Sequence, residues 1–120
     1  NEETDYLKNN SYTFEELLSK HSEELKFKNL TKKVLLHGHC HQKAFDVVKP
    51  IENILKNIRG AKFETIETSC CGMAGSFGYE KEHYKVSMQV GEDTLFPKIR
   101  NIFFKPSRYR LIVHDVVNTV

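Results

Sequence analysis

The stretch that decides the fold is Val34-Leu35-Leu36-His37-Gly38-His39-Cys40-His41. Its first three residues form a short apolar run behind Lys32 and Lys33, which predicts a buried strand. The remaining residues, 37–41, are histidines with one glycine and one cysteine, and this composition predicts a loop. Ligand sites in open α/β sheets gather at the carboxyl ends of strands, so the loop is a candidate site.

An amphipathic helix and a second strand follow this loop. Apolar residues recur at helical spacing from Ala44 onward, and Pro50 must either kink that helix or start its main part, because it has no N–H to donate. Gly60 is a typical helix end. Alternation over residues 62–67 predicts the second strand, and the small residues from Ser69 to Gly78 predict a tight turn. The apolar helix positions are Val47, Val48, Ile51, Ile54, Leu55 and Ile58.

A further helix and a third strand complete the pattern. Gly91 lies within the helix, where it indicates close packing or a break. Pro106-Ser107 marks a turn before a strand at 109–113. Strands that alternate with helices imply right-handed βαβ units, so we predict an α/β fold with a small, mostly parallel sheet flanked by helices. The apolar face of this helix comprises Tyr84, Met88, Gly91 and Leu95.

The N-terminal part divides into two segments. Residues 1–10 are polar and predict a flexible linker. Thr13 followed by Glu16 is a capping-box pattern, which predicts the start of a helix. Residues 11–120 then form a single cysteine-rich domain, since 120 residues allow one compact core. Because the chain begins with Asn1 instead of Met, we expect it to be a fragment of a larger protein.

The composition excludes several classes of partner. The 18 basic and 16 acidic residues give a net charge of +2, which indicates neither a nucleic-acid-binding surface nor an anionic-membrane surface. The sequence contains no apolar run of about 20 residues, and its start has no signal-peptide pattern. Three cysteines, two of them adjacent, do not fit a secreted disulfide scaffold. We therefore expect a reducing, cytoplasmic environment.

The cysteines form the chemically distinctive feature. Cys40 and the pair Cys70-Cys71 each follow a predicted strand, so we expect them to be neighbours at one edge of the sheet. Three thiolates near histidines suit a zinc ion or an iron–sulfur cluster, because soft sulfur ligands select these metals. His39 or His41 would supply a fourth ligand or a supporting hydrogen bond. A free cysteine can also be only a small buried apolar side chain.

A second chemistry is open to the same cysteines. A helix that begins near Tyr79 would place its positive end close to Cys70-Cys71, which predicts a reactive thiol of a thiol–disulfide enzyme. The glycines that follow have the spacing Gly-x-x-Gly-x-x-Gly, which does not fit the dinucleotide-binding pattern.

The cysteine motifs resemble those of a known family. The chain is similar to the cysteine-rich, CCG-type domain at the end of FAD-linked oxidases of the D-lactate and 2-hydroxyacid dehydrogenase type. More distant relatives are the iron–sulfur subunits of glycolate oxidase and anaerobic glycerol-3-phosphate dehydrogenase, and heterodisulfide reductase. The resemblance runs from about Phe14 to Val113 and is carried by His37-Gly38-His39-Cys40-His41-Gln42-Lys43-Ala44 and by Cys70-Cys71-Gly72-Met73-Ala74-Gly75-Ser76-Phe77-Gly78-Tyr79-Glu80.

The resemblance implies a role in electron transfer. Cys40, Cys70 and Cys71 would be ligands of an iron–sulfur cluster or a zinc ion, which handles electrons from a flavin that oxidises a 2-hydroxy acid such as D-lactate or glycolate. Gly72 and Gly75 would let the backbone approach this site and donate amide hydrogens to the sulfurs. FAD would bind in upstream flavin and ferredoxin-like domains of the parent chain. This chain alone would be inactive, and the parent complex would be cytoplasmic or membrane-associated.

One departure from the family pattern bears on the metal. The family has a further cysteine motif after the last strand, whereas residues 114–120 of this chain contain no cysteine. A zinc site with three cysteines therefore becomes comparatively attractive. It would make the domain a structural module that docks the flavin and ferredoxin-like parts, without a redox role.

Overall fold

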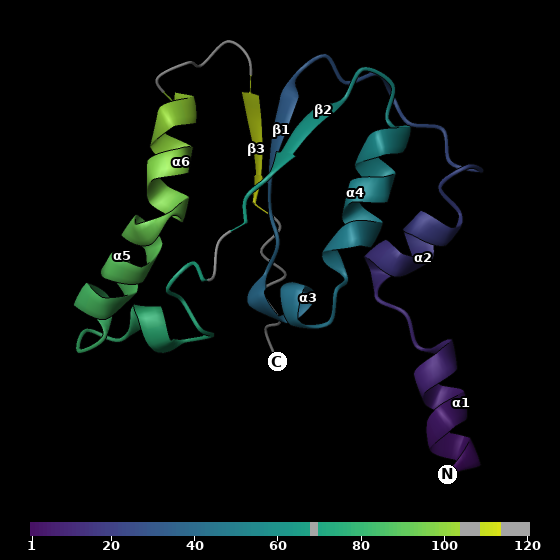
Figure 1. Cartoon of the computed structure of the whole chain (residues 1–120), viewed down its shortest axis with the longest axis horizontal. Coiled ribbons are helices and arrows are strands. Elements are labelled where there is room, and N and C mark those ends of the chain that lie inside the picture. Colours follow the sequence, from purple (N-terminus) through teal and green to yellow (C-terminus); the bar gives the residue numbers. More distant parts are fainter. Residues whose placement is uncertain (68–69, 104–108, 114–120) are drawn as a thin grey trace.

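The computed structural model describes residues 1–67, 70–103 and 109–113 (Figure 1). Three features expected from the sequence lie outside these residues: Ser69 of the predicted tight turn, the Pro106-Ser107 turn, and the segment 114–120. The elements in chain order are α1 (Glu2–Asn10), α2 (Phe14–Lys20), β1 (Lys33–His37), α3 (Cys40–Ala44), α4 (Val48–Asn57), β2 (Lys62–Thr65), the 3₁₀ turn η1 (Phe77–Tyr79), α5 (Tyr84–Asp93), α6 (Leu95–Phe103) and β3 (Tyr109–Val113).

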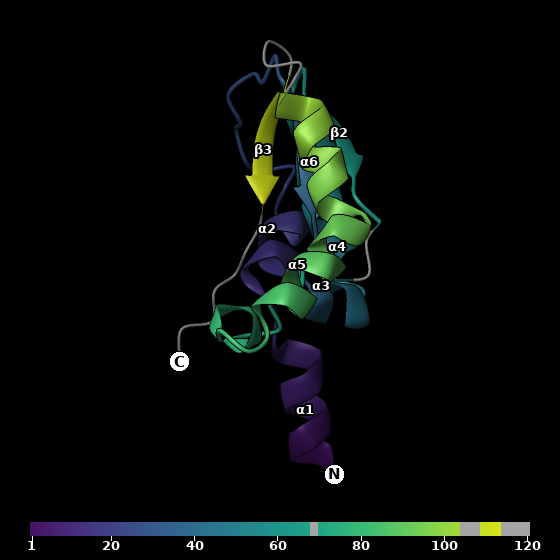
Figure 2. The ribbon, with the colours of Figure 1, turned by 90° about the vertical axis from the view of Figure 1, so that its left-hand side faces the viewer.

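The sheet has three parallel strands in the order β2-β1-β3, which confirms the predicted α/β fold. Lys33 at the start of β1 is paired with Lys62 of β2 and with Tyr109 of β3. The connection from β1 to β2 runs in one direction along the sheet, and the connection from β2 to β3 runs back in the other. Crossovers of one hand then place their helices on opposite faces. Figures 1 and 2 show this arrangement, with α4 on one face and α5 and α6 on the other.

The central strand β1 is buried on both faces. Val34 and Leu36 pack against Ile51 and Leu55 of α4. Leu35 points to the other face, where it packs in a cluster with Ile66 and Leu95. The apolar run therefore lacks the polar alternation of a half-exposed strand because both of its faces lie in the core. His37, the next residue, is also buried, with an exposed fraction of 5%.

The two N-terminal helices differ in how far the sequence predicts them. The capping box is confirmed: the Thr13 N–H donates to Glu16 Oε2 at 2.7 Å, and the Glu16 N–H donates to Thr13 Oγ1 at 3.3 Å. Residues 2–10, part of the predicted flexible linker, form a helix, and the Asn1 side chain caps it by accepting the Thr4 N–H at 2.9 Å. Every residue of 1–10 is exposed, and α1 projects away from the sheet (Figure 1). The role of this segment as a linker stays a prediction.

The sequence predicts one helix whose apolar face runs from Tyr84 to Leu95. The structure instead has two helices, α5 and α6, with a break between them. Helix α5 ends at Asp93, and Thr94 has a non-helical backbone. A Cβ built on Gly91 would lie 2.5 Å from the Phe96 ring, so the predicted close packing at this glycine is confirmed. Across the break, Arg100 Nη1 donates to Glu92 Oε1 at 2.7 Å, and this hydrogen bond lowers the pKa of the Glu92 carboxyl. Among the residues described, no helix is long and apolar enough to cross a membrane.

Candidate cysteine site

The loop after β1 packs tightly against the start of α4. A Cβ built on Gly38 would lie 2.7 Å from Cγ2 of Val48, so a larger residue would displace this loop or the helix. Cys40 is the first residue of α3, and its side chain is half-buried. Helix α3 and the short loop lie at the carboxyl end of β1 (Figure 1). The predicted loop over 37–41 is thus shorter than expected, because His37 ends β1 and Cys40 and His41 begin α3.

His39 caps α3, a role that its position in the sequence does not predict. The His41 N–H donates to Nδ1 of His39 at 3.2 Å, and the His39 N–H donates to Oε1 of the buried Gln42 at 2.9 Å. A neutral imidazole carries one hydrogen, and because Nδ1 is the acceptor here, Nε2 must carry it. Nε2 then has no lone pair for a metal ion. Ligation through Nε2 would therefore require this cap to open, whereas His41 is not held in this way.

The turn that carries the other two cysteines is pressed against α5. Gly72 has φ +88°, and its N–H donates to Cys70 Sγ at 3.3 Å. A Cβ built on Gly72 would lie 2.2 Å from the carbonyl oxygen of Ser87. Gly75 also has a positive φ, +67°, but no other described atom lies within 4 Å of its built Cβ. A single serine inside a helix gives no sequence signal, so the contact of Ser87 with this turn could not be predicted.

A pocket of about 330 Å³ joins the two loops. The residues that line it include His37, the last residue of β1, His39 from the loop that follows, and Cys71 from the turn after β2. Cys71 also packs against the core cluster formed by Leu35, Ile66 and Leu95. One pocket thus contains residues of both motifs, but Cys40 and Cys70, which were expected to be neighbours, are not among the residues that line it. His41 lines a different pocket with His39, between α3 and the N-terminal helices.

The donor chemistry fits a soft metal, but the thiols are not assembled around one point. All three cysteines are free and half-buried. Within 1–67, 70–103 and 109–113, no three His, Cys, Asp or Glu side chains lie close enough together to hold a metal ion. The predicted group of Cys40, Cys70 and Cys71 is therefore not preformed in this structure. The metal or cluster stays a prediction, and we assign no reaction step to it.

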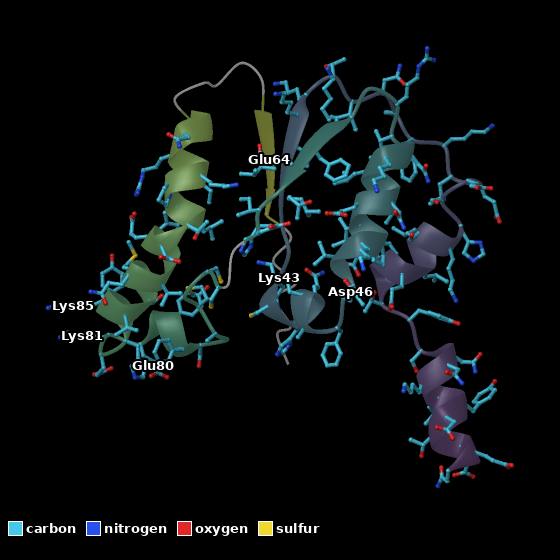
Figure 3. All side chains as sticks on the ribbon, in the orientation of Figure 1. Lys43, Asp46, Glu64, Glu80, Lys81 and Lys85 are labelled. Atoms are coloured by element: carbon cyan, nitrogen blue, oxygen red, sulfur yellow. The ribbon has the colours of Figure 1, made fainter. Side chains whose placement is uncertain are left out.

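Charged side chains surround the site from the outside. Lys81, which precedes α5, and Lys85, in the first turn of α5, point away from the sheet (Figure 3). Asp46, which follows α3, accepts a hydrogen bond from Lys49 at 2.7 Å, and this bond raises the pKa of Lys49. Both partners are largely exposed, so the pair belongs to the solvated surface.

Comparison with known proteins relates part of the chain to a dehydrogenase. A stretch of 67 residues is 34% identical to one of the subunits of the anaerobic glycerol-3-phosphate dehydrogenase of Escherichia coli, in strain K12 and equally in O157:H7. The match covers 56% of this chain and 17% of the relative, so it spans less than a fifth of that protein. No family model and no solved structure matches the chain.

Proposed function

We propose that this chain is a cysteine-rich, CCG-type module of an FAD-linked oxidoreductase, which binds an iron–sulfur cluster or a zinc ion. The observation that carries the proposal is the meeting of two loops at the carboxyl end of the sheet. Cys40 follows one loop at the start of α3, Cys70 and Cys71 lie in the other, and Cys71 lines one pocket with His37 and His39. The partial match to a dehydrogenase supports a redox-related module independently of the structure.

Cys40, Cys70 and Cys71 are the proposed ligands, with His41 or His39 as a further donor. A bound cluster would supply storage for one electron at a time. The Gly72 N–H that donates to Cys70 Sγ would withdraw electron density from this sulfur and so raise the reduction potential. Because the three thiols are not assembled in the described residues, the segments at 38–40 and 70–72 have to move for the site to close.

The rest of the proposed oxidoreductase lies outside this chain. We propose that flavin and ferredoxin-like domains of a larger protein bind FAD and oxidise a 2-hydroxy acid such as D-lactate or glycolate. This chain would then receive electrons from the flavin without turnover of its own. The parent complex would act in the cytoplasm or on a membrane to which other parts attach it.

The test is the metal and sulfide content of the chain after anaerobic reconstitution with iron and sulfide, or with zinc. Iron with acid-labile sulfide and a broad visible absorption band is expected if the module transfers electrons. The variants Cys40→Ser, Cys70→Ser and Cys71→Ser should each lose most of the metal. His21→Asn is the matched control, because His21 is an exposed histidine in a distant turn, and it should keep the metal.

Two outcomes would change the proposal. If the chain binds one colourless zinc ion that depends on the same cysteines, it is a structural docking module and has no role in electron transfer. A chain that binds neither metal in the presence of reductant, while a single cysteine is alkylated rapidly, would contradict both and favour the thiol–disulfide alternative.

A further inference from the structure

The pocket beside Cys71 has a composition that differs from its surroundings. It lies on the face of the sheet covered by α5 and α6, and its volume is about 330 Å³, which is within the range of small-molecule sites. Its walls include the thioethers of Met73 and Met88, the rings of Tyr84 and Phe96, and the thiol of Cys71. Cys71 and Met73 come from the cysteine turn, while Tyr84, Met88 and Phe96 come from α5 and α6.

No Lys, Arg, Asp or Glu side chain lines this pocket among the described residues. Two other pockets at the same end of the molecule are different. One contains Lys43, Asp46 and Glu67 in its lining, and the other contains Lys8, Glu15 and Glu16. The absence of Lys, Arg, Asp and Glu from the described lining thus distinguishes the pocket beside Cys71 from these two pockets.

This lining selects ligands by charge. A carboxylate or phosphate that entered the pocket would lose its hydration and meet no Lys or Arg side chain of the described residues in return, only the imidazoles of His37 and His39, which is unfavourable. Anionic hydroxy acids and phosphate esters therefore fit poorly. A flat, neutral aromatic molecule has a small desolvation cost. It also stacks against aromatic rings and makes favourable contacts with thioether sulfur.

The polar groups in the lining are donors of hydrogen bonds to a neutral acceptor. Ser87 and Tyr84, which each carry a hydroxyl group, belong to the lining, and Ser87 is almost fully buried. His39 also lines the pocket, and its Nδ1 is used as the acceptor of the helix cap, which leaves the hydrogen on Nε2. These groups suit a ligand with one or two uncharged oxygens, such as a phenol or a carbonyl.

We propose that the pocket beside Cys71 binds a small, neutral aromatic molecule that carries hydroxyl or carbonyl oxygen, and that it rejects anions of the same size. The inference goes beyond the proposed function, because it rests on the composition of the pocket and requires neither a metal nor a flavin.

The two methionines provide a direct test. The chain contains only two, and both line the pocket, so methionine labelled with ¹³C at the methyl group gives two NMR signals that both report on it. The metal-free chain is titrated with 2-naphthol, which is neutral, and with 2-naphthoate, which is the anionic counterpart. We expect 2-naphthol to shift both methyl signals and to bind at least tenfold more tightly than 2-naphthoate. D-lactate should shift neither signal.

Variants locate the binding. Met88→Phe fills the pocket and should weaken the binding of 2-naphthol at least tenfold, with the Met73 signal as the remaining reporter. Tyr84→Ala removes an exposed ring from the lining and should weaken binding severalfold without affecting the fold, since Tyr84 is 58% exposed. Val86→Phe is the control, because Val86 is an exposed residue of the same helix outside the lining. It should bind as the wild-type chain does.

The proposal is overturned if 2-naphthol leaves both methyl signals unchanged at saturating concentration. It is also overturned if 2-naphthoate binds equally well, or if the Tyr84→Ala and Met88→Phe chains, shown to be folded by their spectra, bind like the wild type. Metal content measured on the same samples separates this result from the proposed function. Failure to bind the probe in a chain that still takes up iron or zinc would concern the pocket alone.

Discussion

At the scale of single residues, the turn after Cys71 contains two glycines that share a left-handed backbone conformation but differ in their surroundings. Gly72 and Gly75 both have a positive φ, which any other residue adopts only with strain. The built Cβ of Gly72 meets the backbone of α5 at Ser87, whereas that of Gly75 meets open space. The two positions therefore separate the cost of backbone strain from the cost of a steric clash.

We predict that Gly72→Ala destabilises the chain by about 3 kcal/mol, of which about 1 kcal/mol is backbone strain and the remainder is displacement of the turn from Ser87. Gly75→Ala, the matched control, should cost only about 1 kcal/mol. Urea unfolding of the two variants and the wild type measures both values. Equal destabilisation by the two substitutions would show that the turn does not rest on α5.

The sequence predicts the positions of the reactive residues at this scale better than their arrangement. The cysteines follow strands as expected, because strand ends can be recognised from apolar runs. The role of His39 was not predictable, since histidine is not a usual capping residue and the cap depends on the buried Gln42. The three thiols are not gathered as expected, because the path of a glycine-rich turn depends on what it packs against, here Ser87.

At the scale of elements, the break between α5 and α6 is linked to one packing contact. Gly91 lacks a side chain at the point where the ring of Phe96 crosses α5. A glycine inside a helix costs about 1 kcal/mol relative to alanine, so the close approach of the two helices must offset this cost. The sequence correctly predicts close packing or a break at Gly91. It cannot predict that the contacting residue, Phe96, lies only five positions further on and in a separate helix.

We predict that Gly91→Ala destabilises the chain by about 1–3 kcal/mol, because the new methyl group would overlap the Phe96 ring. In a Phe96→Leu background the same substitution should be neutral or stabilising by up to about 1 kcal/mol, since only the gain in helix propensity remains. A double-mutant cycle from urea unfolding should give a coupling of more than about 1 kcal/mol. Gln89→Ala is the control, because Gln89 lies on the exposed side of α5, and it should show no coupling to Phe96→Leu. Additive effects of Gly91→Ala and Phe96→Leu would refute the contact.

At the scale of the whole molecule, the sequence predicted the architecture well. Each predicted strand is present, and the central position of β1 accounts for its uninterrupted apolar run. Helices on both faces follow from crossovers of one hand in opposite directions. The N-terminal segment is the part that differs, because a capped, exposed helix satisfies its polar backbone locally and leaves no apolar pattern to detect.

We predict that removal of residues 1–10 changes the free energy of unfolding by less than about 0.5 kcal/mol, because all ten residues are exposed. Leu36→Ala, in the fully buried strand β1, is the contrasting variant and should cost about 2–5 kcal/mol. Thermal and urea unfolding measure both. A large loss of stability in the shortened chain would mean that α1 packs against the domain.

The place of β1 in the sheet also has a consequence for the synthesis of this chain. Its neighbour β2 ends at Thr65, whereas its other neighbour, β3, begins 44 positions later, at Tyr109. At about 5–20 residues per second, a ribosome needs about 2–9 s to make that segment. Throughout this interval one edge of the apolar strand β1 has no partner in the nascent polypeptide. An unpaired edge can associate with other chains, so this is the period in which chaperones are most needed.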